Sequence, residues 1–287
     1  MLNVDNELRK LNIKAERVEP IRKKDGITVS RIFTGNTRYV LKIFEKEEYL
    51  REINAYCLLQ QLDIPTLQVI GQTECALLLE DIEISRMYRL GEESDLSSPK
   101  VAAGLGKWYR QLHDRGKEFL AHHTLWLYKE TDYFTAENVE FIRRKTHTEK
   151  SEAWDLYMDN CESIRKKLNR MSQTLTYNDF YYTNLIVYAN GCDAMMFDFN
   201  LLGQGYAYGD VSNVLSSLSE EAGEVFLESY GRYDLQEKYV DDVISPVVTL
   251  YMACQRPMFP SWGQAVLQDA LNGVEKKLMH ALEDDGE

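Results

Sequence analysis

The sequence contains few of the residues that characterise disulfide-stabilised, metal-binding or membrane proteins. Its five cysteines form no C-x-x-C pair, and their odd number and wide spacing argue against a disulfide framework. Its five histidines show no usual metal-ligand spacing. No run approaches the roughly 20 apolar residues that span a bilayer, and no apolar segment follows a basic start. These absences predict a cytoplasmic protein with no signal peptide, no zinc site and no membrane partner.

The sequence also lacks an excess of basic residues. Its 287 residues include 33 Lys and Arg against 46 Asp and Glu, a formal net charge of −13. Nucleic acid is therefore not an expected partner, because binding to a phosphate backbone requires a basic surface. Residues 1–83 carry 14 acidic and 12 basic side chains, and the rest of the chain carries 32 and 21. The acidic C-terminal part either aids solubility or attracts a cationic ligand.

The chain has enough apolar material for one large core or two smaller ones, with 44% hydrophobic and 11% aromatic residues. The first eighty residues predict strands with one helix. Runs rich in β-branched and aromatic residues at 27–33 and 39–44 predict strands, and the Gly- and Pro-free segment 45–62 predicts the helix.

The pattern becomes helical from about residue 97. Helices are expected at 101–113, 135–144 and 152–171, and again from 211. A strand pair at 185–199 interrupts them. We therefore expect an α+β fold with a β-rich N-terminal domain over residues 1–83 and a mostly helical C-terminal domain over residues 84–287.

The strand pair forms the most informative segment of the sequence. Asn190-Gly191 is a strong tight-turn pattern, and a hairpin centred there places Asn184 opposite Phe197, next to Asp198. Two oxygen-bearing side chains at the open end of a hairpin suit Mg²⁺, which prefers oxygen ligands and takes few of them from the protein. Asp179 precedes Asn184 by five residues. The alternative is an ordinary polar turn in which these residues serve as caps.

The order Asp179-x-x-x-x-Asn184, hairpin, Asp198 resembles the catalytic loop and metal-binding aspartate of the kinase-like superfamily. The segment T-Y-N-D-F-Y-Y-T-N-L-I-V at 176–187 is similar to the H-G-D-x-x-x-x-N pattern of the aminoglycoside phosphotransferase and choline kinase family, and F-D-F is similar to its I-D-[WF] segment. Asp210 matches a later aspartate that is mainly structural in that family. The resemblance covers residues 25 to about 215 and implies a protein-kinase-like two-lobed fold.

Upstream residues fit the same resemblance. Lys42 lies in an apolar predicted strand, where it needs an anionic partner, and Glu52 lies on the following predicted helix. The pair resembles the strand lysine and helix glutamate that hold ATP phosphates in kinases. Taken alone, the two residues could also be an exposed lysine and an ordinary helix glutamate. The resemblance further implies nucleotide contacts in a hinge, at Glu80, Asp81 and Ile82.

The sequence departs from the family pattern in two places. Tyr177 and Asn178 stand where the family has His and Gly, and no G-x-G-x-x-G segment is present to cover the phosphates. Both departures leave Asp179, Asn184 and Asp198 in place.

The resemblance implies an ATP-dependent O-phosphotransferase that uses ATP or GTP with Mg²⁺. Lys42, oriented by Glu52, would contact the phosphates, Asn184 and Asp198 would hold Mg²⁺, and Asp179 would accept the proton of the substrate hydroxyl. The substrate is expected to be a small hydroxylated molecule that is amine-bearing, given the acidic C-terminal part. An aminoglycoside, choline or ethanolamine, or an amino sugar would fit.

Two other functions compete with this hypothesis. A protein kinase is disfavoured because only eleven residues separate Asp198 from Asp210, which leaves no room for an activation segment. A non-catalytic nucleotide-binding protein on the same scaffold is favoured by Tyr177 and Asn178. The sequence leaves open the substrate, the choice between ATP and GTP, and the oligomeric state.

Overall fold

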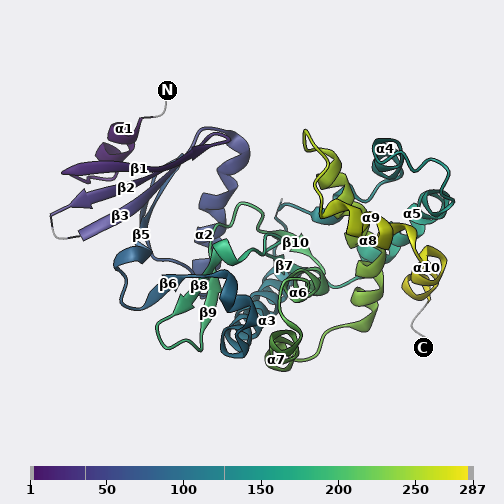
Figure 1. The fold of residues 1–287 in the computed structure, drawn as a ribbon. Coiled ribbons are helices and arrows are strands. Elements are labelled where there is room, and N and C mark those ends of the chain that lie inside the picture. Colours follow the sequence, from purple (N-terminus) through teal and green to yellow (C-terminus); the bar gives the residue numbers. More distant parts are fainter. Residues whose placement is uncertain (1–2, 36, 126, 284–287) are drawn as a thin grey trace. The chain divides into compact units, whose positions relative to one another are not determined.

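The structure is a computed structural model that describes residues 3–35, 37–125 and 127–283 (Figure 1). The chain forms two compact units, each discontinuous in sequence. Unit 1 comprises Met1–Arg115, Asp179–Leu202 and Ser217–Gly231, and unit 2 comprises Gly116–Asn178, Gly203–Ser216 and Arg232–Glu287. The domain boundary near residue 83 stays a prediction.

Unit 1 is built on an antiparallel five-stranded sheet with the order β1-β2-β3-β5-β4 (Figure 1). Its strands are β1 (Arg17–Lys24), β2 (Ile27–Thr34), β3 (Thr37–Phe44), β4 (Val69–Gln72) and β5 (Ala76–Glu80). A short helix, α1 (Val4–Lys10), packs Leu8 against Leu41 and Ile43 of β3. Because side chains alternate across a strand, Lys42 between them points to the opposite face.

A second helix, α2 (Arg51–Gln61), follows β3 after a 3₁₀ turn, η1 (Glu47–Tyr49). The prediction of one helix in this region, starting at residue 45, was therefore wrong in two respects: α1 is an additional helix, and α2 begins six residues later. The Glu45 N–H bonds to the Gly26 carbonyl (2.7 Å), and Lys46 is extended, so the chain stays extended past the end of β3 before it turns into the helix.

The rest of unit 1 consists of a small sheet, one whole helix and part of another. Strands β6 (Tyr88–Leu90), β8 (Leu185–Tyr188) and β9 (Ala194–Met196) form an antiparallel sheet of order β6-β8-β9. Three 3₁₀ turns, η2 (Ile82–Ile84), η3 (Glu93–Ser97) and η5 (Tyr182–Asn184), accompany it, as do α7 (Glu220–Tyr230) and the long helix α3 (Pro99–His122), which continues into unit 2. The β8–β9 pairing sets Leu185 opposite Met196, which confirms the register predicted for this hairpin.

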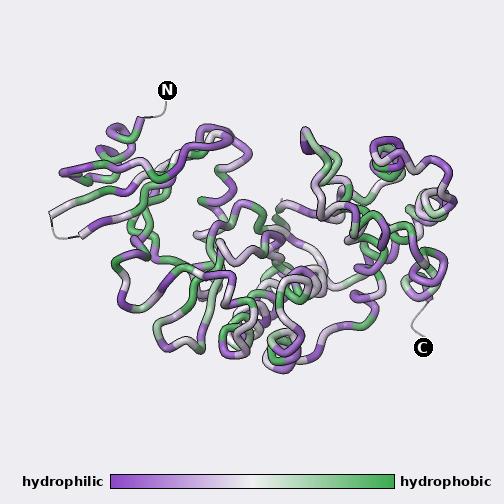
Figure 2. The backbone as a smooth tube through the Cα atoms, in the orientation of Figure 1, coloured by the Kyte–Doolittle hydropathy of each residue, from purple (hydrophilic) through white to green (hydrophobic). Residues whose placement is uncertain are grey.

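Unit 2 is mostly helical. Its elements are η4 (Glu130–Tyr133), α4 (Ala136–Lys145), α5 (Ala153–Arg170), β7 (Thr174–Thr176), β10 (Gly203–Gly205), α6 (Ala207–Leu215), α8 (Leu235–Cys254), α9 (Gly263–Leu271) and α10 (Val274–Leu282). The predicted helices at 135–144 and 152–171 are confirmed. Hydrophobic and hydrophilic residues alternate along these helices (Figure 2), as expected when each helix buries one face. The α+β class, with a β-rich N-terminal part and a mostly helical remainder, is confirmed. No helix in the described residues is long and apolar enough to cross a membrane.

Candidate active site

Lys42 lies at the centre of a buried ion-pair cluster in unit 1. Its Nζ atom is 2.6 Å from a Glu52 carboxylate oxygen and 2.9 Å from Asp198 Oδ1. Burial alone would lower the pKa of Lys42, but the attraction of the two carboxylates outweighs it and raises that pKa. Lys42 therefore stays charged, and it links β3, α2 and the segment after β9.

Glu52 is wholly buried on α2, in line with Tyr56 and Leu59, which are also buried. Burial raises the pKa of Glu52 to about 7, against the opposing attraction of Lys42. A buried carboxylate without a cation would destabilise the folded state, so Glu52 needs Lys42 as its partner.

The segment between Asp179 and Asn184 is closed by a side-chain contact. Asn184 Nδ2 donates to Asp179 Oδ2 (3.0 Å) and to the Asp179 carbonyl (3.1 Å). Burial, followed by the repulsion of the Asp198 carboxylate, raises the pKa of Asp179 to about 6. A half-buried carboxylate with such a pKa is still ionised at neutral pH and can accept a proton.

Asp198 lies where the β8–β9 hairpin opens. The Phe197 N–H bonds to the Asn184 carbonyl (3.0 Å), which brings Asn184 beside the residue before Asp198. Asp198 has a positive φ of 63°, and its Oδ1 accepts hydrogen bonds from Lys42 and from Asn200 Nδ2 (2.7 Å). Such backbone strain is often found at functional sites.

Asn184 and Asp198 are suitable ligands for Mg²⁺. The Asn184 Nδ2 atom is turned toward Asp179, so its Oδ1 atom is the one left for a cation. The described residues contain no group of three or more His, Cys, Asp or Glu side chains that could hold a metal ion. Mg²⁺ binds through one or two protein oxygens together with substrate phosphates, so the pair fits it.

The predicted hinge residues follow β5. Glu80 accepts the Gln68 N–H (2.8 Å), and the buried Asp81 carboxylate lies 2.8 Å from the Nε atoms of both Arg31 and Arg38. Both acidic side chains are thus bound within the protein. Contacts from this segment to a base would therefore come from its backbone and from Ile82.

These residues line one cavity of about 510 Å³ in unit 1. Seven of the eight predicted site residues border it: Lys42, Glu52, Glu80, Asp81, Ile82, Asn184 and Asp198. The eighth, Asp179, contacts it through its hydrogen bond with Asn184. Apolar side chains from the sheet, Val29, Val40 and Leu79, complete the wall. A cavity with an apolar wall and a cluster of charges at one end suits a nucleotide.

In unit 2, Asp210 fixes the backbone that leads into Asp179. Its two carboxylate oxygens accept the N–H groups of Tyr177 (2.7 Å) and Asn178 (2.9 Å). Asn178 has a φ of 62°, a conformation that glycine adopts freely and that Asn tolerates better than most residues. Its Nδ2 donates to Thr176 Oγ1 (2.9 Å). Asn178 can therefore take the place of the family's glycine.

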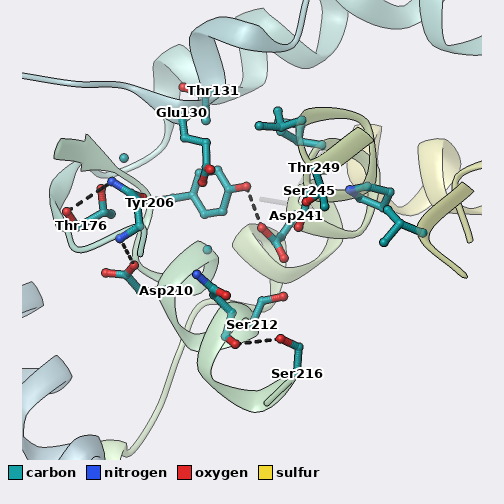
Figure 3. A pocket seen from close by; sticks show the side chains of 18 of the residues that line it. Glu130, Thr131, Thr176, Tyr206, Asp210, Ser212, Ser216, Asp241, Ser245 and Thr249 are labelled. Carbon is teal, nitrogen blue, oxygen red and sulfur yellow. Dashed lines mark hydrogen bonds between the residues drawn. The ribbon is translucent and has the colours of Figure 1, made fainter. Parts of the chain in front are cut away.

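Asn178 also lines a second cavity, of about 480 Å³, within unit 2 (Figure 3). Four carboxylates border this cavity, and among the described residues that line it there is no lysine or arginine. The four are Glu130, Asp210, Asp241 and Asp269. Asp269 is paired with Lys277 (2.8 Å), whereas the Tyr206 hydroxyl points toward Asp241 and donates to it (2.8 Å).

Two buried acids of α8 hold the start of α6. Asp241 accepts the Tyr206 hydroxyl, and Glu237 Oε2 accepts the N–H of Tyr208 (2.9 Å). Burial raises the pKa of each of these two carboxyl groups to about 7. The contact of Glu237 acts as an external cap, because Tyr206 at the N-cap position supplies no side-chain hydrogen bond. The two acids thus fix the helix that carries Asp210.

Comparison with known proteins assigns the family. Residues 22–242 match the APH family, the phosphotransferase enzyme family. The chain belongs to this family. The match covers more than half of the chain and includes the ion-pair cluster, the Asp179–Asn184 loop and Asp210, and it confirms the resemblance found in the sequence.

Solved structures show the same fold as this member of the family. Choline kinase LicA from Streptococcus pneumoniae is 14% identical, with a TM-score of 0.58 over 95% of this chain and 99% of that chain. Macrolide 2'-phosphotransferase MphH from Brachybacterium faecium is 12% identical, with a TM-score of 0.57 over 98% and 97%. APH(2")-IIa, solved as a streptomycin–ATP ternary complex, is 17% identical, with a TM-score of 0.56 over 88% and 94%. These likenesses confirm the kinase-like fold.

LicA has also been solved in complex with AMP, at 14% identity and a TM-score of 0.59 over 92% of this chain and 93% of that chain. No curated protein sequence matches the chain significantly.

Three structural features were not predicted from the sequence. The arginines that hold Asp81, the α8 acids Glu237 and Asp241, and the basic residues of β1 that border the first cavity were not singled out. The two acids lie at i and i+4 on the apolar face of α8, in line with Val240 and Ile244, and this is the pattern that could have pointed to them. Arg31 and Arg38 contact Asp81 from more than 40 residues away in the sequence, and no local pattern predicts such a contact.

Proposed function

We propose that the protein is an ATP-dependent O-phosphotransferase that acts on a small hydroxylated, amine-bearing molecule. The observation that carries this proposal is the Lys42–Glu52–Asp198 cluster beside the Asp179–Asn184 contact, on the wall of a cavity of about 510 Å³. The AMP and ATP complexes of LicA and APH(2")-IIa support ATP as the nucleotide. GTP is the alternative donor. On this proposal residues 1–83 act as the nucleotide-binding lobe.

Each residue has a defined task in this proposal. Lys42, held by Glu52, binds the phosphates of the nucleotide in place of its present contact with Asp198. Asn184 and Asp198 hold Mg²⁺, which when bound would neutralise charge on the transferring phosphoryl group. Asp179 orients the acceptor hydroxyl and takes its proton. Most of the rate enhancement in such a site comes from positioning and from charge stabilisation.

The second cavity is the proposed acceptor site. Asn178 lines it, and Asp179 is the next residue in the chain. The carboxylates on its wall favour a cationic group, which is the reason for proposing an amine on the acceptor. Aminoglycosides, choline or ethanolamine, and amino sugars combine such an amine with a hydroxyl group.

The proposal is tested by a screen of small alcohols and amino alcohols for ATP consumption with Mg²⁺, with Asp179→Asn as the inactive control. Turnover that depends on an acceptor and on Asp179 supports it. For a cationic acceptor, KM should rise between low and physiological salt, because salt screens charges over roughly 8–10 Å. ATP binding without turnover of any acceptor would instead favour a non-catalytic nucleotide-binding protein.

A further inference from the structure

The edge strand β1 carries a cluster of cationic side chains at the first cavity. Ile21, Arg22 and Lys24 line the cavity, whereas Lys23 does not. A β-bulge between Pro20 and Arg22 decides this arrangement, because the pairing with β2 shifts by one residue there. Without the bulge, Ile21 and Lys23 would face the cavity and the two cations of the lining would face away.

The bulge places Arg22 in one row with Lys42 across the sheet. Arg22 is paired with Val29, and Val29 is paired with Lys42. Residues directly opposite each other on antiparallel strands share a face, with Cβ atoms about 5 Å apart, so Arg22 and Lys42 are about 10 Å apart on one wall. A polyphosphate chain is long enough to contact cations at both ends of such a row.

The turn that joins β1 to β2 leaves little backbone for phosphate binding. It consists of Asp25 and Gly26 alone, both with positive φ (56° and 88°). The turn is also attached to the residue that follows β3, because the Gly26 carbonyl accepts the Glu45 N–H (2.7 Å). A glycine-rich loop would bind phosphates with several backbone N–H groups, and this two-residue turn has no room for such a loop.

The cationic side chains on the cavity wall differ in how many carboxylate partners they have. Lys42 is bound by two carboxylates, and Arg31 is bound by Asp81 and by Glu83 (2.6 Å). Lys24 has only a distant contact with Asp25 (3.7 Å), in which both side chains are mostly exposed. The Arg22 side chain makes no hydrogen bond or ion pair with any residue in the described ranges. It is therefore the cation on this wall that can bind an anion without giving up a partner.

We propose that Arg22, supported by Lys24, binds the polyphosphate of the nucleotide and replaces the backbone contacts of a glycine-rich loop. This inference rests on the proposed function, because it assigns a further contact of the same nucleotide. A guanidinium group suits the role, since it binds two phosphate oxygens at once and is always charged.

The experiment measures dissociation constants of ATP, AMP and adenosine by calorimetry on the full chain with Mg²⁺. The variants are Arg22→Gln and Lys24→Gln, and Lys23→Gln is the matched control. Lys23 has the same charge on the same strand, and it pairs with Glu45 (3.3 Å) instead of lining the cavity. Arg22→Gln should weaken ATP binding about tenfold, AMP binding less, and adenosine binding hardly at all. Lys24→Gln should show the same order with a smaller loss.

The control separates a local contact from general electrostatics. Lys23→Gln should leave all three constants within about twofold of those of the unchanged protein, because an exposed charge directed away from the ligand is screened. Equal losses for Arg22→Gln and Lys23→Gln would overturn the proposal, as would an equal loss for adenosine and ATP or no loss at all. If the unchanged protein bound none of the three ligands, the proposed function itself would fail. ATP binding that is insensitive to Arg22 would overturn only this inference.

Discussion

The two units hold their carboxylates in different ways. In unit 1, acids are bound by cations: Glu52 and Asp198 by Lys42, and Asp81 by two arginines. In unit 2, Asp210, Glu237 and Asp241 accept hydrogen bonds from backbone N–H groups and a tyrosine hydroxyl. An ion pair can exchange one of its partners for a charged ligand, whereas a carboxylate held by backbone N–H groups fixes a conformation. The ion pairs of unit 1 are thus suited to bind an anionic ligand such as a nucleotide, and the hydrogen-bonded acids of unit 2 are suited to hold a loop in place.

The largest effect is expected at Asp179. This residue follows directly on the segment of unit 2 that Asp210 holds by hydrogen bonds, and it belongs to unit 1, where acids are held by cations. Asp179→Asn should lower kcat about 10²- to 10⁴-fold, because a proton acceptor is lost, and should leave ATP affinity nearly unchanged. Steady-state kinetics and calorimetry measure the two quantities. Asp193→Asn, in the loop between β8 and β9, does not alter the cavity lining and is the matched control. An Asp179→Asn variant with unchanged turnover would contradict the role of Asp179 as base.

The ion-pair character of unit 1 is tested by Lys42→Met. This variant leaves Glu52 buried without its cation, so the free energy of unfolding should fall by about 3–5 kcal/mol. Urea denaturation measures the change. The double variant Lys42→Met/Glu52→Gln should recover most of the loss, because a neutral amide needs no cation. If the double variant were as unstable as the single one, packing rather than charge would explain the effect.

The hydrogen-bonded acids of unit 2 should make the free energy of unfolding depend on pH. Asp241 ordinarily titrates near 3.8, and burial raises its pKa to about 7. Between these two pH values the folded state binds more protons than the unfolded state, so stability falls as pH rises through this window and is level above it. The contribution of Asp241 to this change is about 4 kcal/mol at most.

The variant Asp241→Asn removes this titration. It should flatten the pH dependence of the unfolding free energy by about a third, because Glu237, Glu52 and Asp179 also have raised pKa values and continue to titrate. Asp242→Asn is the control, since Asp242 is the next residue on α8, is partly exposed and pairs with Lys238 (2.9 Å). A pH profile that is equally steep in Asp241→Asn and in the unchanged protein would show that the carboxyl group is not held neutral by burial.

The sequence was sufficient where chemistry follows from a local pattern. The register of the β8–β9 hairpin depends on the Asn190-Gly191 turn, and it correctly set Asn184 beside the segment of Asp198. Lys42 stands out because a lysine in an apolar strand needs an anion. Arg22 could not be found in this way, since a one-residue bulge in β1 determines on which face of the sheet its side chain lies. The α8 acids escaped for another reason: their partners lie about 30 residues away in the chain.

The smallest effect is expected at Asn178, where the support of the loop is conformational. Asn178→Gly should change the unfolding free energy by less than about 1 kcal/mol, because glycine adopts a φ of 62° freely but gives up the bond to Thr176. Asn178→Ala loses the same bond and must also place a Cβ atom in the left-handed region, so it should cost about 1–2 kcal/mol more than Asn178→Gly. Denaturation curves of the two variants give this difference directly, and the lost bond cancels between them. If alanine were as stable as glycine here, the left-handed conformation would not be needed, and Asp210 alone would fix the approach to Asp179.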